Sequence, residues 1–178
     1  MSNVPKSHRK EHDFVAVHNL IKLRRDITEL AIYDFGYDKD KYEKSIKNFE
    51  DRLKLDDDKK AQVIAKMRKK NESYFADFVE EETAVTRDLM RKTVFEFEMG
   101  NSLFPSGDAV LMEFCEKRKH LDNAIGYLYC LKQELQYIAE TLPSDKNRYI
   151  TIIEDIAREV SLIKGVRRSA NKFLKKKK

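Results

Sequence analysis

A heptad pattern of apolar residues over residues 106–143 constrains the fold more than any other feature of this sequence. If Phe114 is taken as position a, every a position is apolar, and Lys117 is the one polar residue at a d position. The a residues are Phe114, Leu121, Leu128, Leu135 and Leu142, and the d residues are Val110, Lys117, Ala124, Leu131 and Ile138. This spacing places the side chains along one helix face and predicts a helix of about 35 residues. Ser106 or Asp108 is the expected N-cap, and Pro143 ends the helix.

A second heptad series follows Pro143. Tyr149, Ile156, Ile163 and Ala170 lie seven residues apart, which predicts another long helix with Ser144 or Asp145 as its cap. The apolar period continues past Arg167 and Arg168. The basic C-terminal segment is therefore expected to form the last turns of this helix, with only the terminal lysines outside it.

Two further helices are predicted nearer the N-terminus. Residues 12–37 carry a broad apolar face and end at Gly36, and residues 74–99 are helical by composition and period. The chain holds only five Gly and three Pro, so it has few places to turn. The expected fold is all-α, a single domain over residues 1–178 built as an antiparallel up-down-up-down four-helix bundle.

The charged segment 37–73 separates the first two of these helices. It mixes both charge signs with a thin apolar pattern. We expect a helical hairpin or a helix extension that projects from the bundle; the alternative is a partly ordered linker.

Positive charge is concentrated at the two ends of the chain. The net charge is +5, yet residues 164–178 contain eight Lys or Arg and no Asp or Glu, so residues 1–163 carry 28 − 31 = −3. Such polarisation indicates a polyanion partner, with RNA or DNA backbone as the commoner one; the alternative is a tail that only aids solubility. The candidate contacts are Lys6, Arg9 and Lys10 in a basic arm at residues 1–11, and Lys164, Arg167, Arg168, Lys172, Lys175, Lys176, Lys177 and Lys178.

Catalytic and cofactor motifs are missing from the sequence. The glycines are isolated, so no phosphate-cradling loop is present, and His8 and His12 have no suitable third metal ligand. The carboxylates Asp77, Glu80, Glu81 and Glu82 are interpreted as a solvated acidic face. We therefore expect a non-enzymatic protein without metal or cofactor. No secretory signal or run of about 18 apolar residues occurs, so a cytoplasmic protein that spans no membrane is expected.

Small and aromatic residues form a stripe on the outward face of the predicted heptad helix. A monomeric bundle would expose this stripe, which predicts a homo-oligomer interface. Its proposed members are Gly126, Tyr129, Cys130 and Tyr137.

Several phrases of the sequence resemble one bacterial family of four-helix bundle proteins. The phrases are RKTVFEFEMGNSLFPS, EKRKHLDNAIGYLYCLKQELQYIAETLP, LIKGVRRSANK and the N-terminal VPKSHRKEHDFVAVHNLIKLRRDITELAIYDFGY. Over residues 4–36 and 74–172 the chain is similar to the accessory variability determinant of diversity-generating retroelements. A wider branch of that family resembles bundle proteins encoded in intervening sequences of ribosomal RNA genes.

The resemblance implies a non-enzymatic partner of a reverse transcriptase. It implies a pentameric bundle that binds template RNA, and possibly DNA, and that supports mutagenic copying of this RNA into cDNA. Carried onto this chain, further nucleic-acid contacts fall on Arg24, Arg25, Lys117, Arg118 and Lys119.

Lys117 has a specific place in this hypothesis, because it interrupts the heptad seam. We expect it to face a polar centre of the oligomer, so that Lys117→Leu stabilises the bundle and weakens RNA binding. The alternative function is a structural bundle that binds protein partners, with an incidental basic tail.

Overall fold

Helices form all the regular structure in residues 11–175, the part of the chain described by this computed structural model. The long helices are α1 (Glu11–Ile32), α3 (Asp57–Ser102), α4 (Val110–Thr141) and α5 (Asn147–Ala170). The short elements are α2 (Lys39–Arg52), α6 (Lys172–Lys175) and the 3-10 helices η2 (Asp34–Gly36) and η3 (Gly107–Ala109). The prediction of an all-α protein is confirmed.

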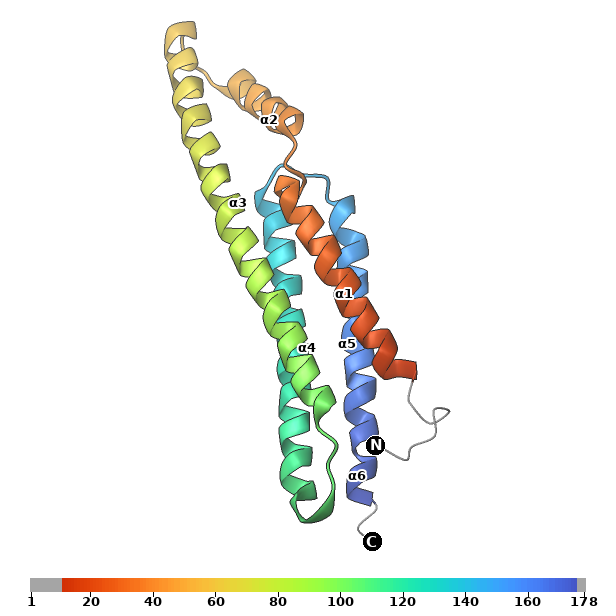
Figure 1. Ribbon diagram of the computed structural model, residues 1–178. Coiled ribbons are helices and arrows are strands. Elements are labelled where there is room, and N and C mark those ends of the chain that lie inside the picture. Colours follow the sequence, from red (N-terminus) through yellow and green to blue (C-terminus); the bar gives the residue numbers. More distant parts are fainter. Residues whose placement is uncertain (1–10, 176–178) are drawn as a thin grey trace.

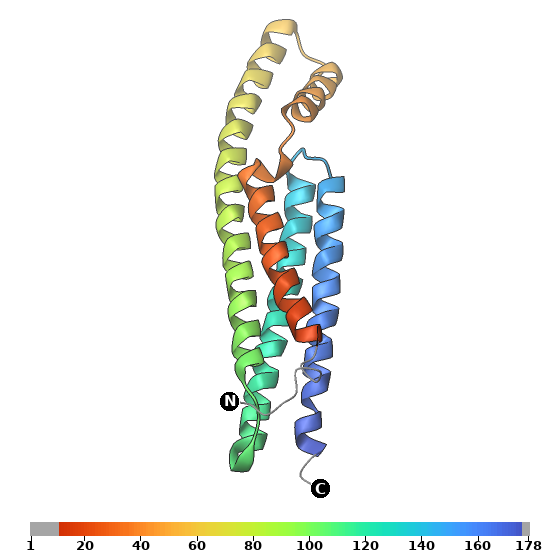
Figure 2. The same cartoon turned by 45° about the vertical axis from the view of Figure 1, so that its right-hand side comes forward.

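The four long helices lie side by side around one apolar core (Figures 1 and 2). Contacts join α1 to α3, α3 to α4, α4 to α5 and α5 back to α1, and we call these four helices the helical body. Both heptad series point into its core: the a and d residues of α4 and the series from Tyr149 to Ala170 in α5 are buried. These two predictions are confirmed, and the basic segment is helical as far as Lys175.

The helix expected at residues 74–99 is the second part of a much longer helix. α3 begins at Asp57 because the carboxylate of Asp56 accepts a hydrogen bond from the Lys59 N–H at 3.0 Å. No glycine or proline lies between Gly36 and Gly100, so nothing interrupts the helix once it has started.

The segment 37–73 is helical and is not a partly ordered linker. Residues 39–73, comprising α2 and the first turns of α3, form a pair of helices that projects beyond the helical body, here called the arm (Figures 1 and 2). Tyr42, Ile46 and Ile64 form its small buried core, and Arg68 pairs with Glu43 across it at 2.6 Å. The predicted helix extension is confirmed.

The turn after α1 is locked against the turn between α4 and α5. α1 ends at Ile32 rather than at Gly36, and the chain turns through Asp34, Phe35 and Gly36, all with positive φ, before it continues outward into α2 (Figure 1). Phe35 adopts φ +53° while fully buried, a conformation that costs free energy for a residue with a Cβ. The hydroxyl of Tyr149 on α5 donates to the Phe35 carbonyl at 2.6 Å and holds this turn in place.

The predicted caps are not the residues that cap the helices. Lys146 is the N-cap of α5 and makes no side-chain cap hydrogen bond, although Asp145, one residue earlier, accepts a hydrogen bond from the Asn147 N–H. Neither Ser106 nor Asp108 caps α4, because η3 leads directly into it through Ala109, whose side chain cannot accept a hydrogen bond.

Within residues 11–175, no helix combines the length and apolar character needed to cross a membrane.

Candidate nucleic-acid interface

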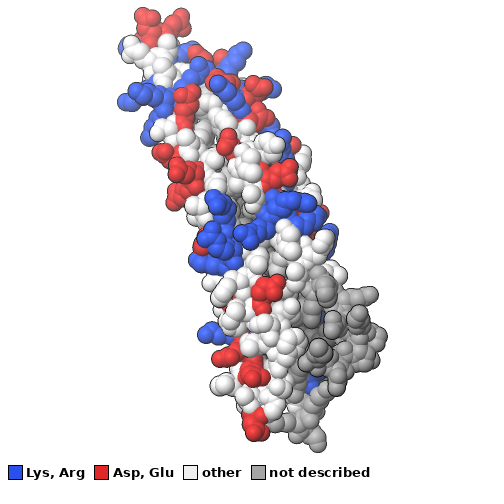
Figure 3. Space-filling model, in the orientation of Figure 1, with Lys and Arg blue, Asp and Glu red and all other residues white. Residues whose placement is uncertain are grey.

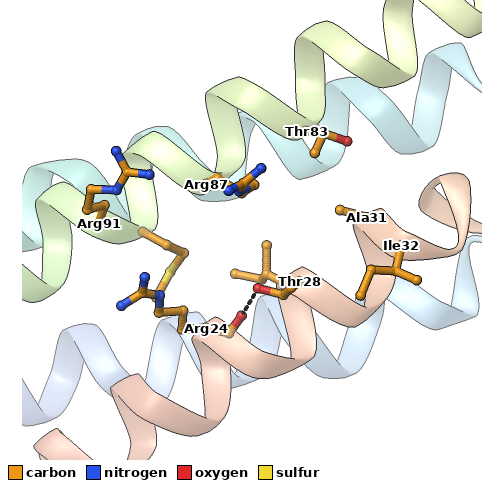
Figure 4. A pocket seen from close by; sticks show the side chains of 9 residues that line it. Arg24, Thr28, Ala31, Ile32, Thr83, Arg87 and Arg91 are labelled. Atoms are coloured by element: carbon orange, nitrogen blue, oxygen red, sulfur yellow. Dashed lines mark hydrogen bonds between the residues drawn. The ribbon is translucent and has the colours of Figure 1, made fainter.

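A cleft between α1 and α3 brings together three arginines from different parts of the sequence. Arg24 lies on α1, and Arg87 and Arg91 lie one turn apart on α3; all three line a cavity of about 310 Å³ (Figure 4). We call this cavity the arginine cleft. Of these three residues only Arg24 was predicted from the sequence.

The arginine cleft has an apolar floor and a polar rim. Ile27, Ala31 and Met90 line it and are buried, because the same side chains belong to the core that joins α1 to α3. The hydroxyl of Thr28 donates to the Arg24 carbonyl at 2.7 Å, while Thr83 faces the cleft from α3 (Figure 4). The floor therefore fixes the backbones that carry the arginines, and their guanidinium groups remain exposed to solvent.

No carboxylate in the described part of the chain neutralises the arginines of the cleft. Within the described residues, none of the three makes an ion pair, although Asp88 lies between Arg87 and Arg91 in the sequence. Asp88 instead pairs with Lys92 at 2.6 Å. Three guanidinium groups around one cavity create a positive potential and offer forked donors that match phosphate oxygens.

The surface charge is arranged in bands along the molecule. Figure 3 shows Lys and Arg side chains gathered in a belt over the middle of α1 and α3. Above this belt acidic and basic side chains are mixed, and below it the surface is mainly acidic or uncharged. The arginine cleft thus belongs to a local basic zone within a surface that is otherwise mixed or acidic.

Sequence reasoning missed Arg87 and Arg91 because α3 carries many charges of both signs. A signal was present: Arg87 has Thr83 and Arg91 four residues away, and Arg91 has Phe95 on its other side. Neither arginine therefore has an acidic partner at the i±4 spacing that stabilises ion pairs on helices. The sequence does not indicate which helix packs beside Arg87 and Arg91.

The predicted basic residues on α4 and α5 lie on a different face of the helical body. Arg167 pairs with Asp122 across α4 and α5, and Arg118 lies 3.8 Å from the same carboxylate. Lys164 donates to the Tyr129 hydroxyl at 2.8 Å. Because α1, α3, α4 and α5 contact one another in a closed ring, the face formed by α4 and α5 lies opposite the arginine cleft. The predicted contacts thus do not form one continuous surface.

The remaining predicted contacts divide into exposed and undescribed residues. Arg25 is exposed and pairs with the neighbouring Asp26 at 3.1 Å. Lys119, Arg168 and Lys172 are exposed. Lys175 ends α6, while Lys6, Arg9, Lys10, Lys176, Lys177 and Lys178 lie outside the described residues.

Lys117 does not face outward to an oligomer centre or to RNA, as the sequence led us to expect. It is 5% exposed, and its ammonium donates to the carbonyls of Gly100 at 2.7 Å and Leu103 at 3.0 Å. The side chain therefore caps the C-terminal end of α3, where unpaired carbonyls and the helix dipole favour a cation. In the chain as described it cannot reach a phosphate, and it explains the polar residue in the heptad seam without an oligomer.

The predicted oligomer stripe lies on the outward face of α4. Gly126, Tyr129, Cys130 and Tyr137 are all exposed, and nothing lies within 4 Å of the place where a Cβ on Gly126 would sit. Tyr137 packs its ring edge against Phe78 on α3, with ring centroids 5.5 Å apart. One side of the stripe therefore packs against α3 through Tyr137, and its outer side is exposed to solvent.

Two buried carboxylates were not expected from the sequence. Glu82 is 6% exposed, so the interpretation of residues 77–82 as a solvated acidic face is wrong at this residue. Burial raises the pKa of Glu82, and the Glu134 and Glu81 carboxylates raise it further. Glu159 on α5 is fully buried against α1. Within residues 11–175, no three His, Cys, Asp or Glu side chains are arranged to hold a metal ion.

Comparison of this chain with protein-family models, with curated proteins and with solved structures gave no match.

Proposed function

We propose that this protein is a non-enzymatic, nucleic-acid-binding accessory subunit of a reverse transcriptase. The observation that carries the nucleic-acid part is the arginine cleft, where Arg24, Arg87 and Arg91 line one cavity and make no ion pair with any described residue. Exposed and unneutralised guanidinium groups favour phosphate, and displacement of counterions from the nucleic acid supplies much of the binding free energy. The resemblance to the retroelement accessory family supports the reverse transcriptase as partner.

Binding through this site depends on the phosphate backbone rather than on the bases. The lining consists of arginines, threonines and aliphatic side chains, with no aromatic ring among the residues of the arginine cleft on which a base would stack. Phosphate contacts position a nucleic acid but carry no sequence information. Such a subunit holds the template RNA, and the cDNA that follows, while the polymerase selects the nucleotides.

The proposed architecture is the antiparallel up-down-up-down four-helix bundle, assembled from α1, α3, α4 and α5. The ring of contacts among these helices supports it, as do the short turns between α3 and α4 and between α4 and α5. We propose a homo-oligomer, a pentamer by resemblance, through the open stripe on α4. The proposed setting is the cytoplasm of a cell that carries a diversity-generating retroelement.

The nucleic-acid proposal is tested by titrating a fluorescent single-stranded RNA with the protein at low salt. We expect the triple variant Arg24→Gln, Arg87→Gln, Arg91→Gln to bind at least tenfold more weakly than the parent protein. The matched control replaces Lys59, Arg68 and Lys92 by Gln, because these exposed cations already pair with Asp56, Glu43 and Asp88. Equal loss in both variants would show that only net charge matters.

The reverse-transcriptase part requires its own experiment. The protein is co-expressed with a reverse transcriptase encoded beside its gene, and copying of the adjacent template RNA is measured with and without it. We expect copying to depend on the protein and to fall in the arginine variant. If no reverse transcriptase is encoded beside the gene, or if copying does not change when the protein is left out, the reverse-transcriptase part of the proposal is wrong. The nucleic-acid-binding part would then stand alone.

A further inference from the structure

The end of the helical body where α3 turns into α4 has a surface unlike that of the arginine cleft. Residues 95–116, here called the acidic tip, contain five acidic residues and no Lys, Arg or His. The acidic residues are Glu96, Glu98, Asp108, Glu113 and Glu116. The basic helix α6 lies at the same end of the helical body and contacts α4 (Figures 1 and 2), so the negative charge is local to residues 95–116. A surface segment of one charge sign attracts partners of the other sign.

Large apolar side chains are exposed at the same tip. Phe104 in the turn is 72% exposed, and Leu111 and Met112 in the first turn of α4 are each 62% exposed. Phe95 and Met99 on the last turns of α3 are 59% and 40% exposed. Five such residues within one turn and its flanking helix ends are more than isolated surface residues, and exposed apolar groups gathered in this way mark protein interaction sites.

Three of the tip carboxylates are available to a partner. Glu96 lies 2.6 Å from the His120 ring, and Glu113 accepts a hydrogen bond from the Ser106 N–H. Among the described residues, Glu98, Asp108 and Glu116 have neither an ion pair nor a hydrogen bond from another side chain. The tip thus combines unneutralised negative charge with uncovered apolar surface.

The turn that presents this surface is held by internal contacts. The ammonium of Lys117 binds the Gly100 and Leu103 carbonyls and lies 5.6 Å from the centre of the Phe104 ring. Gly100 packs closely enough on α4 that a Cβ there would lie 3.0 Å from Leu121. A turn fixed in this way presents Phe104 without the ordering cost that a flexible loop would add on binding.

We propose that the acidic tip docks a basic amphipathic segment of a protein partner. The apolar side chains of that segment would cover Phe104, Leu111 and Met112, and its Lys or Arg side chains would meet Glu98, Asp108 and Glu116. Charge excludes a nucleic acid, since phosphates are repelled by the same carboxylates. The C-terminal residues 172–178 of this chain, KFLKKKK, also combine apolar and basic side chains, and α6, with which they begin, already contacts α4.

The test uses three synthetic helical peptides and the full-length protein. The first peptide places Leu at the i, i+3, i+4 and i+7 spacing and Lys at the other positions, which gives a helix with one apolar and one basic face. The second peptide replaces its Leu by Ser, and the third replaces its Lys by Glu. Binding is followed by fluorescence anisotropy at physiological salt. We expect saturable binding of the Lys/Leu peptide, with each of the other two at least tenfold weaker. Absence of Lys/Leu binding, or equal binding of all three, overturns the proposal.

Variants then locate the binding surface. The apolar variant Phe104→Ser, Leu111→Ser, Met112→Ser and the charge variant Glu98→Gln, Asp108→Asn, Glu116→Gln should each weaken Lys/Leu binding at least tenfold. The control for the apolar variant is the triple variant Ile21→Ser, Ile32→Ser, Tyr33→Ser, whose residues are similarly exposed but lie outside the tip. The control for the charge variant is the triple variant Asp51→Asn, Asp58→Asn, Glu72→Gln, whose residues are also exposed. Equal effects of tip and control variants overturn the proposal.

RNA binding separates this inference from the proposed function. Tip variants with native circular dichroism spectra should retain RNA affinity, and the arginine variant should retain peptide affinity. Loss of RNA binding in the tip variants would assign the tip to the nucleic acid and would overturn the docking proposal.

Discussion

Glu159 gives the sharpest quantitative prediction, because burial makes the stability of the protein depend on pH. The side chain is fully buried, and within the described residues neither carboxylate oxygen has a hydrogen-bond partner of good geometry. Burial raises the pKa of Glu159 from 4.5 to about 8, and the nearby side chain of Asn19 opposes part of this rise. The folded protein therefore holds a proton on Glu159 that the unfolded chain releases at neutral pH.

The sign and the size of the effect follow from this difference. Below pH 4.5 the carboxyl is neutral in both states and costs no stability through ionisation. As pH rises from 4.5 to about 8 the unfolded state is increasingly favoured, and the loss then levels off. At about 1.4 kcal/mol per pH unit the total loss is about 5 kcal/mol, of which about 3 kcal/mol falls between pH 5 and 8.

The assay is urea unfolding followed by circular dichroism between pH 5 and 9, at one protein concentration, for the parent protein, Glu159→Gln and the exposed control Glu154→Gln. Subtracting one profile from another cancels the titration of the other groups. We expect the advantage of Glu159→Gln over the parent protein to grow by about 3 kcal/mol from pH 5 to 8. Parallel profiles for these two proteins would refute the argument.

Three further predictions concern stability and are checked by the same urea unfolding. Lys117→Met should destabilise the protein by about 2 kcal/mol, because it leaves two buried or partly buried carbonyls at the end of α3 without their hydrogen bonds from the ammonium. A more stable variant would favour the prediction from the sequence that Lys117 faces the centre of an oligomer. Gly100→Ala should be less stable than Gly126→Ala, because a Cβ at Gly100 would lie 3.0 Å from the fully buried Leu121 side chain, whereas Gly126 has open space and Gly126→Ala should stabilise by about 0.5–1 kcal/mol. Equal effects of the two substitutions would show that the Leu121 side chain moves aside. Tyr149→Phe should cost about 1 kcal/mol through the lost hydrogen bond to Phe35, and no loss would show that the turn holds without it.

The core could be predicted from the sequence because its apolar residues recur at a regular seven-residue spacing. Residues spaced seven apart, such as Leu121, Leu128 and Leu135, lie on one face of a helix, and these three side chains are fully buried. Helix ends were less predictable. The N-cap of α5 is Lys146 rather than Ser144 or Asp145. α3 begins at Asp57 rather than near Tyr74, because a thin apolar pattern does not prevent an uninterrupted helix from forming.

The candidate site could not be predicted because it depends on which helices are neighbours. Arg24 and Arg87 are far apart in the sequence and meet only because α1 packs against α3. Lys117 shows the converse: its position in the seam was read correctly, but its partners are backbone carbonyls, which no side-chain pattern reveals. Glu159 likewise lies one turn from Ile156 and Ile163 on the core face, where an apolar residue is the ordinary expectation.

The salt dependence of RNA binding tests the central claim most directly. Affinity for a single-stranded RNA is measured across a salt series for the parent protein, for the variant with Arg24, Arg87 and Arg91 replaced by Gln, and for the paired-cation control. If the arginine cleft holds phosphates, the logarithmic slope of the arginine variant should be shallower by about 2, since each lost contact removes about 0.7. The control should keep the parental slope. Equal slopes for all three proteins would contradict the assignment of the cleft as the nucleic-acid interface.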